Sequence, residues 1–385
     1  MEIRYAKEED RRAIQSLWEY CFKDSESFNT YYFKQVFAPE NTLLCLEDDQ
    51  LKTALQLNPH DLFIGDHVYK SSYVVGVSSR PEARGKGYMK ALMQKSLEEM
   101  YHKGEIFSIL MPIDSRIYEP YGYAYISDHL KYKVNLSSIN RVKLSTELVP
   151  IQEQHLYELT RFYNLQMQNK GIWVHRNEKL FNRILDEVAS EGGYCYACEQ
   201  GGRITGFLFY YLAEDQLEVR EMLYDDKRTL ETFMNLFLMH QTQVKRIKVN
   251  EASDGRLKYL LPQDGINIMH LAPFMMGRII NFKRFIEALD FSTNEDAEIR
   301  ISVIDEHIKE NNKVYGIKYG PNRVKVEENQ QKPHVTLSIS SLTGLLTGYL
   351  TYDEVVFLDG LTYNKKAKQF FNILSNQTNY INEFV

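Results

Sequence analysis

The alternation of apolar and polar positions predicts a strand, a tight turn and a helix between residues 73 and 100. The apolar run over residues 73–77 is typical of a buried strand. Pro81 should end this strand, because proline cannot continue a hydrogen-bonded ladder. A helix should follow the turn, since apolar residues recur there at helical spacing. They are Met89, Leu92, Met93 and Met100.

The same patterns give the elements around this turn. A strand is predicted over residues 3–6, then a helix with an apolar stripe and a second helix over residues 31–36. Strands should follow at 42–47, 51–57 and 68–79, and a further buried strand at 106–111 comes after the turn and its helix. The stripe consists of Ile14, Leu17, Trp18 and Cys21. We expect this first unit to span residues 1–136.

The turn has the chemistry of an anion site. Gly85 and Gly87 allow a tight bend and the close approach of a ligand. The unpaired N–H groups at the start of the helix carry the positive end of its dipole. The spacing is that of neither a P-loop nor a Gly-x-Gly-x-x-Gly dinucleotide loop. It resembles the Arg/Gln-x-x-Gly-x-Gly/Ala pyrophosphate loop of the GNAT acetyltransferases, which bind acetyl-CoA, except that Met89 replaces a small residue.

The rest of the chain predicts two further units. The second, over residues 149–272, should contain helices at 152–167 and 177–188, a hairpin at 193–211, a strand at 217–224 and a helix at 229–241. The third, over residues 274–385, should begin with an amphipathic helix at 275–289. Strands at 297–304, 313–319, 322–327 and 334–339 and a short helix at 341–346 should follow. Such a mixture of sheets and helices predicts an α+β fold.

Residues 217–230 repeat the strand, turn and helix of the first unit without its chemistry. The turn has no glycine and carries Asp225 and Asp226. Carboxylates in this place would repel a pyrophosphate. We therefore expect a second GNAT-like unit that lacks a CoA site.

Composition limits the classes of function. A chain of 385 residues predicts two or three domains, and its net charge of −6 gives no support for nucleic-acid binding. No apolar run reaches the length of a membrane span, and the first residues lack a secretory signal. Four cysteines indicate a reducing cytoplasm. Cys195 and Cys198, three apart on a predicted strand, should point to opposite faces, so no metal site is expected.

A tyrosine segment adds a second motif. Residues 118–123, Tyr-Glu-Pro-Tyr-Gly-Tyr, resemble the Tyr-x-x-Phe/Tyr-Gly-Tyr segment of many GNATs, whose last tyrosine lies near the thioester sulfur. Packing accounts for Tyr118 and Tyr121, whereas Tyr123 matches the functional position. With the loop and the three-unit layout, the whole chain resembles the Eis (enhanced intracellular survival) acetyltransferases. In that family a catalytic GNAT domain precedes a second GNAT-like domain and a domain like sterol carrier protein.

The resemblance implies a set of site residues and an assembly. The strand at 106–111 should splay from its neighbour, and the pantetheine arm of acetyl-CoA, the cosubstrate, should lie in the gap. Tyr123 is implied as the general acid toward the CoA thiolate, and the family suggests a homo-oligomer, a hexamer. The acetyl-CoA contacts expected from the loop and the family are Val77, Ser78, Ser79, Arg84, Gly85, Lys86, Gly87, Tyr88, Met89, Lys90, Tyr118 and Glu119.

The general base is implied to be the C-terminal carboxylate. Direct transfer needs a neutral amine, so some group must accept its proton. Residues 73–79 contain no glutamate, and a buried terminal carboxylate would gain basicity by desolvation. The family pattern is an acidic residue and then a terminal aromatic. Glu383 and Phe384 match this pattern and Val385 is one residue extra, so either the register is shifted or Val385 carries the carboxylate.

These features predict an acetyl-CoA-dependent N-acetyltransferase that acts on an amine by direct transfer. The family suggests polyamines, including aminoglycosides, and an acidic acceptor pocket. Asp24 and Glu383 are candidates for that pocket, or else solvated surface charges. The alternatives are a non-enzymatic acyl-CoA or lipid-binding protein and a peptide N-acetyltransferase.

Overall fold

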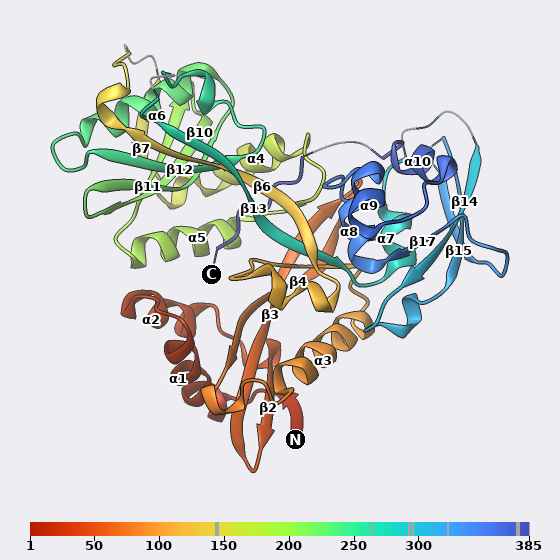
Figure 1. The fold of residues 1–385 in the computed structure, drawn as a ribbon. Helices are drawn as coiled ribbons and strands as arrows, with labels where there is room; N and C mark the ends of the chain where they lie inside the picture. The colour runs from red at the N-terminus through yellow and green to blue at the C-terminus, as the bar shows by residue number, and fades with distance from the viewer. Residues whose placement is uncertain are drawn as a thin grey trace.

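The computed structural model describes residues 1–142, 146–262, 265–291, 293, 296–321, 323–374 and 378–384. Within these ranges, thirteen strands form one sheet that runs through the first and second units (Figure 1). Its order is β1-β2-β3-β4-β5-β13-β6-β12-β11-β10-β9-β7, with β8 paired to β3. The strands are β1 (Glu2–Tyr5), β2 (Thr42–Glu47), β3 (Gln50–Ile64), β4 (His67–Ser79), β5 (Phe107–Leu110), β6 (Ala124–Asn135), β7 (Glu147–Pro150), β8 (Trp173–Val174), β9 (Tyr194–Gln200), β10 (Arg203–Ala213), β11 (Gln216–Tyr224), β12 (Arg246–Ala252) and β13 (Ile268–Ile279).

Two long strands join the first unit to the second. β6 pairs with β12 on one side and with β13 on the other, and the far end of β13 also pairs with β5. The sheet is therefore continuous from one unit to the next. β8 adds a smaller link, because it pairs with β3 at Leu62 and Phe63.

Helices cover both faces of this sheet. In the first unit, Tyr73 and Val75 of β4 face α1 and α2, whereas Val74 between them faces α3, as the alternation of a strand requires. None of the described helices is both long and apolar enough to cross a membrane. Those of the first two units are α1 (Arg11–Cys21), α2 (Glu26–Gln35), α3 (Tyr88–His102), α4 (Leu156–Met167), α5 (Glu178–Ser190) and α6 (Lys227–Met239).

The described part of the third unit has its own sheet, in the order β16-β15-β14-β17, and α7, α8 and α10 pack against its strands. Its strands are β14 (Ala297–Ile304), β15 (Val314–Gly320), β16 (Arg323–Glu328) and β17 (Val335–Ser338). Its helices are α7 (Phe282–Ala288), α8 (Ile339–Leu346), α9 (Tyr352–Asp359) and α10 (Lys365–Phe371). The short helix predicted at 341–346 is confirmed as the larger part of α8.

The helix predicted over residues 275–289 is wrong in its first part. Residues up to Ile279 belong to β13, and α7 begins only at Phe282, after Asn281 caps it by accepting from the Arg284 N–H at 3.1 Å. The end of β13 is buried on both faces, so its residues do not alternate between apolar and polar as those of a half-buried strand do. The expected junction between units at 272–274 also falls inside β13. Residues 280–281 are a better boundary.

The C-terminal segment, residues 378–384, leaves the third unit and runs between the other two. The Tyr380 N–H donates to the Ile172 carbonyl at 2.9 Å, and the Gly171 N–H donates to the Thr378 carbonyl at 3.1 Å. The segment ends between α5 and the strands of the first unit (Figure 1). There the Tyr73 hydroxyl donates to the Glu383 carbonyl at 3.3 Å.

Candidate active site

The start of α3 is an uncapped helix N-terminus. β4 ends at Ser79, a 3₁₀ turn over Pro81–Ala83 follows, and Gly87 is the N-cap residue. Gly85 and Gly87 have φ angles of +74° and +87°, and a Cβ at either position would meet nothing within 4 Å. Backbone conformation rather than crowding therefore requires glycine here. In the described chain no side chain caps α3, so the N–H groups of its first turn stay available.

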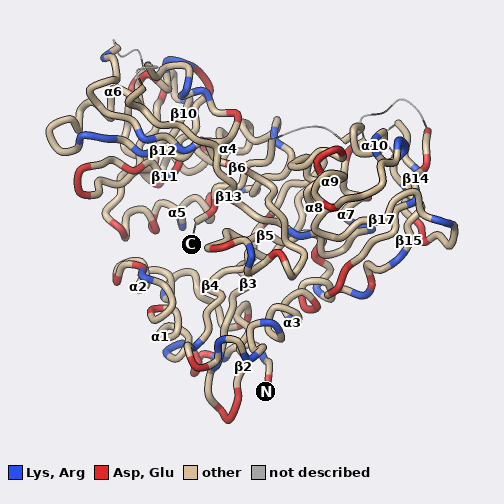
Figure 2. Tube along the Cα trace, viewed as in Figure 1, with Lys and Arg blue, Asp and Glu red and all other residues tan. Residues whose placement is uncertain are grey.

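Three basic residues surround these N–H groups. Arg84, Lys86 and Lys90 are exposed, and none of them forms an ion pair within the described residues. Figure 2 marks the basic positions at the start of α3 in blue. Free cations beside the positive end of a helix dipole form a site for an anion. The structure thus brings together the residues that the sequence placed in the loop.

The loop is anchored to the core behind it. The Tyr88 ring is buried with Leu92 of α3, and its hydroxyl donates to the Glu47 carboxylate. That hydrogen bond raises the pKa of Tyr88 to about 12. Met89 is half-buried against the same core. The side chains of Tyr88 and Met89 therefore hold the loop against the core.

The matching turn in the second unit differs in one decisive way. The N-cap residue of α6 is Asp226, whose carboxylate accepts from the Thr229 N–H at 2.8 Å. Burial raises the pKa of Asp225 beside it. The N–H groups that would hold a phosphate on α3 thus face an acidic cap on α6. This arrangement supports the expectation that the second unit has no CoA site.

β4 and β5 separate after a short parallel pairing. Their register pairs Ser72 with Ser108 and Tyr73 with Ile109, and the described chain has no further pair between them. β4 then bulges at Gly76, whose φ is +59° and whose Cβ would lie 2.3 Å from the Trp18 ring. The two strands splay as expected.

The residues after the bulge line the end of β4. Val77 is half-buried, Ser78 is buried, and Ser79 leads into the loop. The Thr53 hydroxyl donates to the Ser78 carbonyl at 2.6 Å, and the Ser79 hydroxyl donates to Thr53 at 2.9 Å. β3 thus fixes this part of β4 from one side, and the splayed side remains for a ligand.

Tyr123 lies fully buried at the base of the splay. Its hydroxyl is 2.9 Å from the Ser108 hydroxyl, which donates to the Ser72 carbonyl at 2.9 Å. Ser108 can therefore only accept from Tyr123, and Tyr123 is the donor. Burial raises the pKa of Tyr123 well above its ordinary value. The hydroxyl is thus protonated near neutral pH, as a general acid must be.

Tyr118 and Glu119, the acetyl-CoA contacts expected outside the loop and β4, lie in different surroundings. Tyr118 is buried, its ring centroid is 6.4 Å from that of Tyr123, and burial raises its pKa to about 12. Glu119 is exposed and accepts from the Ser115 hydroxyl at 2.6 Å. Tyr118 therefore belongs to the wall beside Tyr123, and Glu119 lies at the surface.

The C-terminal acidic residue is not where the sequence placed it. Glu383 is 4% exposed and forms an ion pair with Arg176 at 2.9 Å, so it is neither a solvated charge nor a wall of the acidic pocket. Burial alone would raise the pKa of Glu383, but the charge of Arg176 lowers it overall. Val385, the predicted base, lies outside the described residues.

An acidic pocket of about 240 Å³ lies where the C-terminal segment meets α2, α5 and β11. Among the described residues that line it, Arg220 is the one cation, and its charge is paired with Glu187 at 2.7 Å. Asp24 is exposed, lines this pocket and accepts from the Trp18 indole N–H at 2.8 Å. Burial raises the pKa of Glu191, so this carboxyl is a weaker acid than a solvated glutamate. The acids are Asp24, Glu187, Glu191 and Glu218, and the aromatic walls are Phe28, Tyr211 and Phe384.

Sequence reasoning missed the contribution of the second unit to this pocket. Glu187 comes from α5, Glu191 is the C-cap residue of that helix, and Glu218 and Arg220 come from β11. Charged residues within a predicted strand were the available signal, because a buried strand carries charge only where a partner compensates it.

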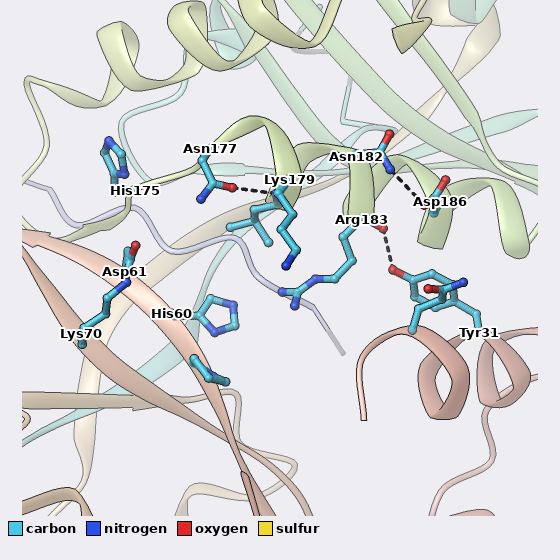
Figure 3. A pocket seen from close by; sticks show the side chains of 13 residues that line it. Tyr31, His60, Asp61, Lys70, His175, Asn177, Lys179, Asn182, Arg183 and Asp186 are labelled. Carbon is cyan, nitrogen blue, oxygen red and sulfur yellow. Dashed lines mark hydrogen bonds and ion pairs between the residues drawn. The ribbon is translucent and has the colours of Figure 1, made fainter. Parts of the chain in front are cut away.

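A larger cavity of about 450 Å³ lies along the same helix, between α2, β3 and α5 (Figure 3). Lys179, Arg183 and His60 point into it, and Lys70 lies beside Asp61 with an ion pair of 2.7 Å. The Tyr31 hydroxyl closes one end by donating to the Arg183 carbonyl at 2.6 Å. The lining of this cavity is polar and partly basic, so its chemistry differs from that of the acidic pocket.

Comparisons with known proteins agree with this geometry. Residues 2–126 match the sequence model of an acetyltransferase (GNAT) domain, and residues 172–279 match that of a second acetyltransferase (GNAT) domain. Residues 282–382 match a sterol carrier protein domain. The chain thus contains two acetyltransferase (GNAT) domains followed by a sterol carrier protein domain. The expected tandem GNAT folds with a C-terminal sterol-carrier-like domain are confirmed.

Solved structures share this fold along the entire chain. A probable N-acyltransferase from Enterococcus faecalis is 19% identical with a TM-score of 0.89, over 100% of this chain and 99% of that one. A GCN5-related N-acetyltransferase from Anabaena variabilis is 19% identical with a TM-score of 0.84, over 100% of both chains. Eis1 from Mycobacterium abscessus is 13% identical with a TM-score of 0.78, again over 100% of both. No curated protein matches the sequence of this chain.

Proposed function

We propose that the protein transfers an acetyl group from acetyl-CoA to the amine of a small cationic molecule, such as a polyamine or an aminoglycoside. The N–H groups and basic residues at the start of α3 would hold the pyrophosphate. The pantetheine arm would lie where β4 and β5 splay, with the thioester near Tyr123. The acceptor would enter the acidic pocket between α2, α5 and β11.

We infer the chemical class of the acceptor from the lining of the acidic pocket. Its carboxylates outnumber its one paired cation, and its aromatic walls suit an alkylammonium or an aminosugar. A protonated amine would be drawn in by charge and must then lose its proton before it attacks the thioester carbon. The C–S bond would break as the C–N bond forms.

Two groups would handle the protons in this scheme. The terminal carboxylate would accept the proton of the amine, directly or through water. Tyr123 would give its proton to the departing thiolate, since its hydroxyl is the donor in its pair with Ser108. Attack is direct, so no covalent intermediate forms on the enzyme.

The test is release of CoA thiol from acetyl-CoA with a panel of polyamines and aminoglycosides. Asp24→Asn should raise KM for the amine about 5-fold, equivalent to about 1 kcal/mol, while KM for acetyl-CoA stays unchanged. The asparagine oxygen can still accept from Trp18, so the pocket should keep its shape. Glu40→Gln, which changes an exposed acid outside the pocket, is the matched control.

Two results would refute the proposal. Binding of CoA without amine-dependent release of thiol would favour a non-enzymatic acyl-CoA binder. Equal effects of the Asp24 and Glu40 variants on KM for the amine would remove the acidic pocket from acceptor recognition.

A further inference from the structure

The second GNAT domain keeps the strand splay of the first. β11 and β12 pair in parallel from Gln216 with Arg246 to Val219 with Val249, and then stop. β11 bulges at Arg220, the next residue. In the first domain the same sequence of features, the end of pairing at Tyr73 and a bulge after it, marks the proposed place of the acyl-CoA arm. The capped, acidic start of α6 disfavours the pyrophosphate of an acyl-CoA here.

The chain's own C-terminal segment lies against this splay. The Asn382 amide donates to the Arg220 carbonyl at 3.4 Å, just beyond the last pair of β11 with β12. The Tyr380 hydroxyl donates to the Glu221 carboxylate at 3.2 Å. β11 therefore contacts the segment at two successive residues.

Buried charges fix the segment more firmly. Arg176, which is 0% exposed, binds Glu221 of β11 at 2.9 Å and Glu383 of the segment at 2.9 Å. Its guanidinium also lies over the Tyr163 ring, 4.3 Å from the centroid. A buried arginine between two carboxylates has no solvent to replace a lost partner. The position of Glu383 is thus tied to the second domain.

The next residue is held by a second arginine. The Arg220 guanidinium lies 5.1 Å from the centroid of the Phe384 ring, and its other contact is Glu187 of α5. Both Arg220 and Phe384 line the acidic pocket. On its opposite side the segment contacts the first domain, where Tyr73 at the end of the β4–β5 pairing binds the Glu383 carbonyl.

We propose that the second GNAT domain holds the C-terminal segment in the active site, with Arg176 as the main positioning residue. The splay that would take an acyl-CoA arm in a catalytic GNAT domain instead receives residues 380–383. Arg176 acts through Glu383 and sets where Phe384 stands in the acceptor pocket. The proposal rests on the proposed function for its kinetic test, and on the described contacts alone for its structural test.

The structural test is hydrogen exchange of the full chain, followed by mass spectrometry of the peptide that contains residues 378–384. In the wild type the Tyr380 N–H is protected by its hydrogen bond to the Ile172 carbonyl. In Arg176→Gln this N–H should exchange at least 10-fold faster than in the wild type. Glu383→Gln should accelerate the exchange of this N–H in the same way. Because it leaves Arg176 paired with Glu221, it still tests the proposal if Arg176→Gln does not fold. Asp215→Asn, which breaks the exposed pair with Arg246, should leave this peptide unchanged.

The kinetic test uses the same variants. Arg176→Gln should lower kcat/KM for the amine at least 10-fold while the Kd of CoA changes less than 2-fold. The double variant with Glu383→Gln should lose no more than the single one, because both act on one contact.

The outcomes separate the two proposals. Unchanged exchange of residues 378–384, additive losses in the double variant, or weaker CoA binding in parallel with lost activity would each overturn the role of Arg176. Faster exchange with an unchanged kcat/KM for the amine would overturn it too. A wild-type protein without amine-dependent activity would refute the proposed function, and the exchange result would still decide how the segment is held.

Discussion

The proton on Glu105 gives a prediction whose size follows from the structure. Glu105 is 8% exposed, and it accepts from the Ser72 N–H at 2.9 Å and from the Ser72 hydroxyl at 2.8 Å. Burial raises the pKa of Glu105 from 4.5 to about 7, because the Ser72 hydrogen bonds and the charge of Lys103 offset only part of it. Ser72 in turn accepts from Ser108, so Glu105 supports the residues beneath Tyr123.

The raised pKa means that the folded chain binds this proton more tightly than the unfolded chain does. The resulting stability is fully present below about pH 4.5 and is lost as the pH rises through about 7. At about 1.4 kcal/mol per pH unit, the whole effect is about 3 kcal/mol. Glu105→Gln cannot ionise, and its amide oxygen can still accept from Ser72. The variant should therefore keep stability that the wild type loses.

Urea unfolding of both proteins at pH 5 and at pH 8.5 measures this effect. The free energy of unfolding of Glu105→Gln minus that of wild type should be about 2–3 kcal/mol larger at pH 8.5 than at pH 5, which means that the variant gains stability relative to wild type. Comparing the two proteins at each pH cancels the other titrating groups. A difference between them that does not change with pH would show that Glu105 titrates normally, and the reasoning from its burial would be wrong.

Two further predictions concern the residues of the site. Tyr123→Phe should lower kcat at least tenfold and cost about 1 kcal/mol of stability, because it loses the hydrogen bond to Ser108. Tyr121→Phe, in the same buried cluster, should leave kcat unchanged. Steady-state kinetics measures both variants, and an unaltered kcat in Tyr123→Phe would remove Tyr123 from the mechanism. Gly87→Ala should raise the Kd of CoA about tenfold because the φ of +87° is strained for alanine. Gly202→Ala is the control, because its φ of +75° is similarly strained for alanine and its Cβ would also meet nothing within 4 Å. It should lose similar stability and leave the Kd of CoA unchanged. Calorimetry that gave the same change in Kd for both variants would contradict the role of the loop in CoA binding.

The features that could be predicted from the sequence are local ones. The loop before α3 depends on two glycines with positive φ and on a helix whose apolar stripe is close in sequence, so its shape follows from neighbouring residues. Tyr123 was found by a motif of six residues. The acidic turn of the second domain was also readable, since the cap that Asp226 forms on α6 is local.

The features that could not be predicted depend on distant pairing. Residues 275–279 looked helical because β13 is buried on both faces by elements far away in the chain. Glu383 looked like a pocket acid because its partner, Arg176, lies 207 residues earlier. The acidic pocket needed α5 and β11 of the second domain beside Asp24, and no local pattern brings these elements together.

The most direct test of the account is a calorimetric titration with CoA. Wild type should bind CoA, and charge reversal of both Arg84 and Lys86 to Glu should weaken binding at least 10-fold at low salt. The same reversal of Lys227 and Arg228, at the start of α6, is the matched control and should leave binding unchanged. Absent binding by the wild type, or equal effects of the two reversals, would contradict the claim that the open start of α3 is the acyl-CoA site.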